Sequence, residues 1–125
     1  MKYQDMPYER VDFDRVEKEF NGLKEDFAAA KSGEEQFAVH ERYYALRDRV
    51  DTMMTLAQTR HDGNTADEFY SAEQDYYDKM SPRYSNMVIE YQKLLYDSPY
   101  RQVLEEKIGP VDFKNTVLSR KAMQE

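Results

Sequence analysis

Apolar residues recur at alternating spacings of three and four along three long stretches of the chain, and this periodicity constrains the fold most. An α-helix turns once in about 3.6 residues, so side chains at these spacings share one face. The first stretch follows Asp12, a residue suited to cap a helix, and its pattern ends at residues 31–33. Its apolar stripe consists of Phe13, Val16, Phe20, Leu23, Phe27 and Ala30.

The second stretch opens with Ser32 followed by Glu35, the spacing of a capping box. We expect this helix to end near Arg60 and His61, because residues 62–64 read Asp-Gly-Asn, which favours a turn. Its stripe consists of Val39, Tyr43, Leu46, Val50, Met53 and Ala57, widened by Phe37, Tyr44 and Met54.

The third stretch begins with Thr65 and Glu68, a second capping-box spacing. Pro82 lies inside it and removes a helical hydrogen bond. We therefore expect either a kink near Met80 or a break with Ser81 capping a new helix. The predicted buried stripe is Phe69, Ala72, Tyr76, Met80, Tyr84, Met87, Tyr91 and Leu94.

The two ends of the chain are less regular. Residues 1–11 are expected to form an extended arm. A short helix is predicted from Pro99 to about Ile108, ended by Gly109, and a last helical segment with a thin apolar face over 112–124. The fold class is therefore all-α: residues 1–125 form one helical domain, an antiparallel bundle of three long helices with one or two short C-terminal helices.

The charge and composition exclude several classes of function. The net charge is −7, so phosphate backbones and anionic membranes would repel the chain, and we expect no nucleic-acid or membrane partner. There is no cysteine, which excludes disulfides and thiolate metal sites. No apolar run approaches the ~20 residues of a membrane span, and the N-terminus lacks the apolar stretch of a secretory signal. We expect a cytoplasmic protein.

Two histidines are too few for most metal sites, and neither stands in a metal-binding motif. His40 precedes Glu41, but the second histidine that a zinc-protease helix needs four residues later is replaced by Tyr44. A di-iron bundle needs Glu three residues before His, and that spacing is also missing. We therefore predict no catalytic and no metal-binding residue in this chain, no cofactor, and a partly exposed His40.

The most distinctive feature is the tyrosine-rich stretch from residue 69 to 84. Tyr70 and Tyr77 are seven positions apart and share a helix face next to the main stripe. They either widen the core or line a surface for a peptide or another domain. Arg60 and His61 lie near the same loop, where they either serve turn and helix-end chemistry or extend that surface.

Several segments together resemble the N-terminal region of the oligoendopeptidase F family of zinc metallopeptidases, relatives of thimet oligopeptidase. No one segment is a catalytic signature, so the resemblance depends on their combination and order. They are residues 6–10 (MPYER), 60–61 (RH), 65–70 (TADEFY), 73–78 (EQDYYD), Pro82, 98–101 (SPYR) and 104–109 (LEEKIG).

The resemblance implies a part of a larger enzyme. Members are several times longer, and their zinc site, an H-E-x-x-H helix with a later glutamate, lies beyond the region that this chain matches. The implied role is to help wall a groove that admits short peptides, with zinc held by a catalytic domain that is the chain's partner and an oligopeptide as substrate. The thin apolar pattern of residues 121–125 agrees with a truncated end.

Two other hypotheses stay open from the residues alone. One is a stand-alone helical interaction module that binds a protein partner through the face of Tyr70 and Tyr77. The other, weaker one is a metal or cofactor bundle, for which the ligands are already too few.

Overall fold

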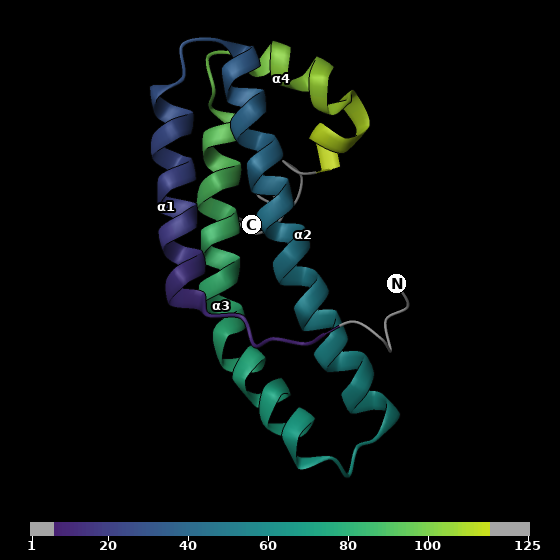
Figure 1. The fold of residues 1–125 in the computed structure, drawn as a ribbon. Coiled ribbons are helices and arrows are strands. Elements are labelled where there is room, and N and C mark those ends of the chain that lie inside the picture. Colours follow the sequence, from purple (N-terminus) through teal and green to yellow (C-terminus); the bar gives the residue numbers. More distant parts are fainter. Residues whose placement is uncertain (1–6, 116–125) are drawn as a thin grey trace.

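The computed structural model describes residues 7–115, and all regular structure in that range is helical. The helices are α1 (Phe13–Ala29), α2 (Gly33–Gly63), α3 (Glu68–Tyr96) and α4 (Arg101–Ile108), and residues 110–115 are helical as well. The first three run antiparallel along one long axis, while α4 and the segment after it lie across one end (Figure 1). The predicted all-α bundle is confirmed. The rest of the predicted last helix, and the expected truncated end, lie outside the described residues.

Side-chain caps fix the starts of the first two helices as predicted. The Asp12 carboxylate accepts a hydrogen bond of 3.0 Å from the backbone N–H of Asp14. The Ser32 hydroxyl accepts one of 3.1 Å from the N–H of Glu35. The Glu35 carboxylate accepts from the N–H of Lys31 at 2.6 Å, one residue before the cap. The first backbone N–H groups of a helix have no carbonyl acceptor within the helix. Each capping side chain supplies an oxygen that accepts a hydrogen bond from such a group.

The predicted start of the third helix is wrong by two residues. The cap is Asp67, whose carboxylate accepts from the N–H of Phe69 at 2.8 Å, and not Thr65. Residues 64–67 form a turn instead, in which the N–H of Asp67 donates to the carbonyl of Asn64 at 3.1 Å. The Asn64 side chain also accepts from the N–H of Ala66 at 3.3 Å. This turn takes Thr65 out of the capping position.

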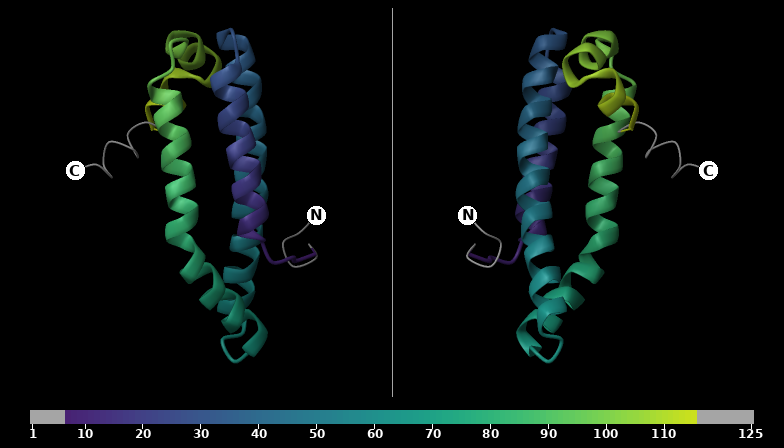
Figure 2. Two further views of the ribbon diagram at one scale, coloured as in Figure 1. Left: turned by 90° about the vertical axis from the view of Figure 1, so that its left-hand side faces the viewer. Right: turned by 90° about the vertical axis from the view of Figure 1, so that its right-hand side faces the viewer.

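Helix α3 continues through Pro82, so the predicted break at Ser81 does not occur. Figure 2 shows that the ribbon changes direction in the N-terminal half of α3 and leans toward the end of α2. Pro82 and Asp78, four residues earlier, are both exposed. The carbonyl that loses its helical partner therefore faces water, which accommodates a bend without breaking the helix.

The stripes of α1 and α2 pack against α3 along most of its length. The buried side chains of α1 are those of the predicted stripe except Ala30, which lies at the C-cap. On α2 the central stripe is buried as predicted, but Phe37, Met53 and Met54 are half-buried and Tyr44 is 68% exposed. Gln36, His40 and Leu56 are buried although the pattern did not predict them. At the other end, Leu104 of α4 and Phe113 are fully buried beneath the end of the bundle.

The predicted stripe of α3 fails at its N-terminal end. Phe69 is 56% exposed and Ala72 is exposed, whereas Glu73 and Tyr77 are buried. Further along, Tyr84, Met87 and Tyr91 are buried as predicted, and Leu95 takes the place expected of Leu94. The buried face is thus displaced by one residue at both ends of α3.

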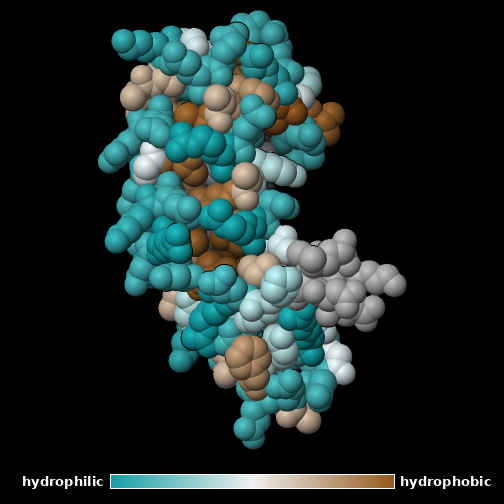
Figure 3. Space-filling model, viewed as in Figure 1, coloured by the Kyte–Doolittle hydropathy of each residue, from teal (hydrophilic) through white to brown (hydrophobic). Residues whose placement is uncertain are grey.

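The surface is largely hydrophilic. On the face that Figure 1 presents, the most hydrophobic residues show through only as a seam along the long axis, between rows of hydrophilic side chains (Figure 3). None of the helices between residues 7 and 115 combines the length and apolar character that crossing a membrane requires.

Candidate functional site

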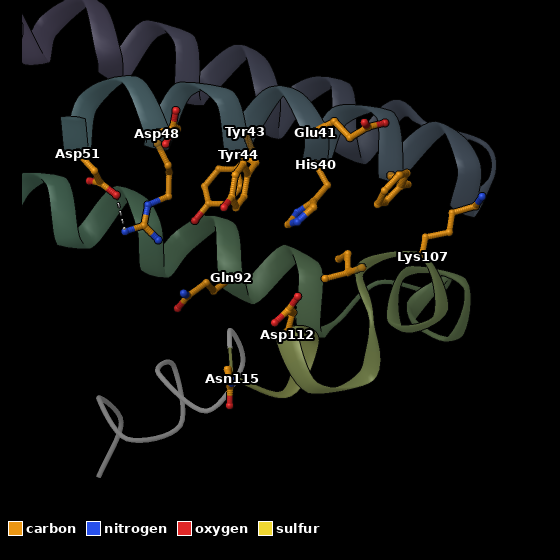
Figure 4. A pocket seen from close by; sticks show the side chains of 13 residues that line it. His40, Glu41, Tyr43, Tyr44, Asp48, Asp51, Gln92, Lys107, Asp112 and Asn115 are labelled. Carbon is orange, nitrogen blue, oxygen red and sulfur yellow. Dashed lines mark ion pairs between the residues drawn. The ribbon is translucent and has the colours of Figure 1, made fainter. Parts of the chain in front are cut away.

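A hollow of about 770 Å³ lies between α2, α3 and the helical segment that follows α4. Figure 4 shows the side chains of His40 and Tyr44 directed from α2 toward α3. Tyr43 and Asp48 of the same helix also line the hollow. Gln92 of α3 faces them. The hollow is closed at one end by Lys107 and Ile108 of α4 and by Asp112 and Asn115 of the segment after it. Its size is that of a site for a small ligand or an inserted side chain.

The floor of the hollow consists of His40 and Tyr43, which stack on Tyr91, a fully buried residue behind them. The rings of Tyr43 and Tyr91 are parallel within 17°, with centroids 3.6 Å apart. The Nδ1 atom of His40 lies 2.7 Å from the Tyr91 hydroxyl oxygen. Burial lowers the pKa of His40 from 6.5 to about 4, so its imidazole is neutral at pH 7. The prediction that His40 is partly exposed is wrong, because the side chain lies within the α2–α3 contact.

Tyr43 brings a buried hydroxyl to this floor. The residue is 3% exposed. Burial raises the pKa of its hydroxyl, whereas the neighbouring Arg47 guanidinium lowers it. One turn away, the Tyr84 hydroxyl donates to Asp51 at 2.9 Å, and the Arg47 guanidinium lies 3.6 Å from the same carboxylate. Arg47 therefore lies between Tyr43 and the Asp51–Tyr84 pair.

The rim of the hollow is acidic. The carboxylates of Glu41, Asp48, Asp51 and Asp112 line it, against the cations of Arg47 and Lys107. Within the part of the chain that the structure describes, Asp51 pairs with Arg47, whereas Glu41 and Asp48 form no ion pair. No group of three or more potential metal ligands is found among residues 7–115. The rim therefore suits a cationic or hydrogen-bonding group rather than a metal ion.

A second polar cluster ties the N-terminal arm to α3. Glu73 is 3% exposed and accepts two hydrogen bonds of 3.1 and 3.0 Å from Nε of Arg10, besides an ion pair with its NH2 group. Tyr8 donates to the same carboxylate at 2.6 Å. The bonds from Arg10 hold the pKa of Glu73 below its usual range. We call Tyr8, Arg10, Glu73 and Tyr77 the arm clamp.

Tyr77, one of the predicted surface residues, belongs to this clamp. Its hydroxyl oxygen lies 2.7 Å from that of Tyr8 and accepts from the backbone N–H of Val11 at 3.1 Å. The side chain is 3% exposed, so it offers no outer surface in this structure. The neighbouring Tyr76 hydroxyl donates to the carbonyl of Val11 at 2.6 Å, which holds the arm from its other edge.

The other three predicted residues lie near the far end of the bundle. Arg60 donates to the Tyr70 hydroxyl at 3.0 Å, and Tyr70 also contacts the ring of Tyr8 edge-on, at 5.8 Å between centroids. His61 is half-buried, and its Nδ1 atom has no partner among the described residues. The structure thus brings Arg60 and Tyr70 together, and it separates them from Tyr77 by directing Tyr77 inward.

Comparison with known protein families identifies the chain. Residues 3–123 match the model of the peptidase M3 N-terminal domain. This chain belongs to that family. The family resemblance inferred from the sequence is confirmed, and the chain is the N-terminal domain of an M3-type peptidase.

Solved structures contain the same domain within longer chains. A structure described as PZ peptidase A with an inhibitor is 32% identical to this M3 domain and superposes with a TM-score of 0.91 over 96% of it. A structure described as an oligoendopeptidase F from Bacillus anthracis str. Ames has the same identity and TM-score over 97%. The M3 domain covers only 21% and 22% of those two chains, about a fifth. Among curated proteins, no significant relative was found.

Sequence reasoning did not find the hollow of this M3 domain. His40 and Tyr91 are 51 residues apart, and their contact depends on the relative rotation of two helices. A partial signal existed, because Tyr43, Tyr84 and Tyr91 were all placed on predicted core stripes. Periodicity shows that such rings meet inside a bundle, but it does not show where their hydroxyl groups end.

Proposed function

We propose that this chain is the N-terminal scaffold and substrate-groove domain of a zinc-dependent metalloendopeptidase that cleaves oligopeptides. Its partners are then the catalytic domain of the parent peptidase and an oligopeptide substrate. The hydrolytic residues and the zinc belong to that catalytic domain, and this chain supplies none of them. The compartment proposed is the cytoplasm, and neither nucleic acid nor a membrane is a proposed partner.

One observation carries the proposal. The family match extends over residues 3–123, yet the domain spans about a fifth of the two peptidase chains that it superposes on. A domain of this kind contributes shape and surface to an enzyme whose reaction takes place elsewhere. The arm clamp and the aromatic floor support a scaffold role, since both are buried polar networks that fix the relative positions of distant segments.

The experiment has two parts. The reading frame is first sequenced beyond Glu125, where an H-E-x-x-H motif with a later glutamate is expected. The 125-residue chain and the longer polypeptide are then assayed with a quenched-fluorescent oligopeptide, with and without added zinc. Zinc-dependent cleavage by the longer polypeptide alone is the expected result. A variant with Gln in place of the Glu of that motif is the control for contaminating peptidases.

Two results would overturn the proposal. Zinc-dependent turnover by the pure 125-residue chain would show that it carries its own catalytic site. A reading frame without the zinc motif would remove the parent peptidase and favour a stand-alone interaction module.

A further inference from the structure

We propose that the hollow between α2 and α3 is the docking site for the catalytic domain, and that the docked segment carries a Lys or Arg side chain to Glu41 and Asp48. This inference rests on the proposed function and deepens it by assigning the face and the chemistry of the contact. Four features of the described residues support it.

The first feature is an exposed aromatic residue at the mouth of the hollow. Tyr44 is 68% exposed, although it neighbours the buried Tyr43 on the same helix. Half-buried Phe37 and Ile108 line the same hollow. Aromatic and apolar side chains in a concavity with a polar rim are typical of a protein–protein interface.

The second feature is the polar base of the hollow. Tyr43 and Gln92 line it and are only 3% and 5% exposed. A segment inserted into the hollow can offer these side chains a backbone carbonyl or a polar group.

The third feature is charge. Glu41 and Asp48 are exposed, they line the hollow, and neither pairs with a cation of the described chain. The nearby Arg47 is already held by Asp51 and by the Tyr84 hydroxyl, 3.4 Å from its Nε atom. Charge complementarity therefore selects a basic segment.

The fourth feature is the length of the chain in the relatives. In the solved relatives about four-fifths of the chain lies outside the matching domain, which is ample to cover the hollow. A docking segment joined covalently to this domain has a raised effective concentration.

Hydroxyl-radical footprinting, read residue by residue by mass spectrometry, tests the inference on native side chains. Among residues 7–115, the large aromatic side chains that are exposed are Tyr44 at the hollow and Phe69 at the far end of α3, at 68% and 56%. Both should oxidise readily in the 125-residue chain. In the longer polypeptide we expect the oxidation rate of Tyr44 to fall at least about fivefold, as for a residue at the centre of an interface, while that of Phe69 changes little.

Charge variants test the chemistry of the contact. Exchanging both hollow carboxylates in the longer polypeptide (Glu41→Lys with Asp48→Lys) should restore much of the oxidation rate of Tyr44. The matched control, Glu25→Lys with Asp78→Lys, changes the net charge equally at exposed positions outside the hollow and should leave Tyr44 protected.

Three outcomes would overturn the inference. They are an unprotected Tyr44 in the longer polypeptide, equal protection of Tyr44 and Phe69, and protection that appears only when oligopeptide is added, which would assign the hollow to substrate. The peptidase assay keeps the two proposals apart. Cleavage without protection removes the docking site alone. Protection without cleavage removes the proposed function, and with it the catalytic domain as the occupant of the hollow.

Discussion

His40 and Tyr91 join α2 to α3 through a 2.7 Å contact between Nδ1 and the hydroxyl oxygen, inside a stack of three aromatic rings with Tyr43. The imidazole is 8% exposed. Charging it would place a cation in the helix contact with no carboxylate bonded to it. The folded structure therefore contains the neutral imidazole. On acidification, His40 should be the first of the buried groups on the floor to be protonated.

Stability should fall as the pH drops from 7 to 4.5. The folded pKa of His40, about 4, lies below its ordinary 6.5, so between these values the unfolded chain binds the proton more tightly. The contribution of His40 to the free energy of unfolding is fully present above pH 6.5. It declines toward pH 4, by up to roughly 3 kcal/mol in total. Urea unfolding of the wild type and of His40→Gln at several pH values measures this, and the variant should lose less stability on acidification.

Tyr91→Phe separates burial from the hydrogen bond in that experiment. Burial is the cause of the lowered pKa of His40, so this variant should keep the acid dependence while losing about 1 kcal/mol at pH 7. A wild type and a His40→Gln variant with parallel pH profiles would show that His40 does not contribute.

The sequence was sufficient to predict the helices, their order and most of their buried faces, because the stripes of α1 and α2 consist of apolar residues. It was insufficient wherever a polar residue is buried. Glu73 occupies a core position on α3 because Arg10 and Tyr8 arrive from the arm, and periodicity counts glutamate as solvent-facing. The face of α3 therefore rotates toward Glu73, which exposes Phe69. Of the candidate surface, only the neighbourhood of Arg60 and Tyr70 could be located from sequence.

The arm clamp should contribute strongly to stability. In Arg10→Met the buried Glu73 carboxylate loses its cation, and we expect a cost of about 2 kcal/mol, less than for a fully buried pair because Arg10 is 49% exposed. The control is Arg42→Met, which breaks an exposed pair with Asp26 and should cost under about 1 kcal/mol. Chemical denaturation at pH 7 compares them, and equal costs would contradict the role of burial.

The Glu73 part of this stability should also depend on pH. Its folded pKa is lowered, so the contribution is present above the unfolded value of 4.5 and is lost as the pH falls through the folded value. A double-mutant cycle of Arg10→Met with Glu73→Gln should therefore give a coupling energy of about 1–2 kcal/mol at pH 7. The coupling should shrink in acid, and a coupling that does not change with pH would argue against the ion pair.

The corrected start of α3 gives a direct test of the capping residue. Asp67→Ala removes the acceptor for the N–H of Phe69 and should destabilise the domain by about 1 kcal/mol. Thr65→Ala changes an exposed residue in the preceding turn and should change stability by less than about 0.5 kcal/mol. The midpoint of thermal unfolding ranks the two variants, and the opposite order would restore Thr65 as the cap.

Gly33 lets α2 and α4 approach closely, and Gly33→Ala should destabilise the domain although alanine favours helices. A Cβ atom at this position would lie 2.5 Å from Cβ of Val103, an atom fixed to the backbone of α4, so the short helix has to move. Overpacking of this kind costs about 1–3 kcal/mol, which exceeds the helical gain of up to about 1 kcal/mol.

Gly22 in α1 has nothing within 4 Å of such an atom, so Gly22→Ala should instead stabilise the domain by about 0.5–1 kcal/mol. Urea midpoints that move in opposite directions for the two substitutions would attribute the difference to the α2–α4 contact, whereas stabilisation by both would show that α4 yields without cost.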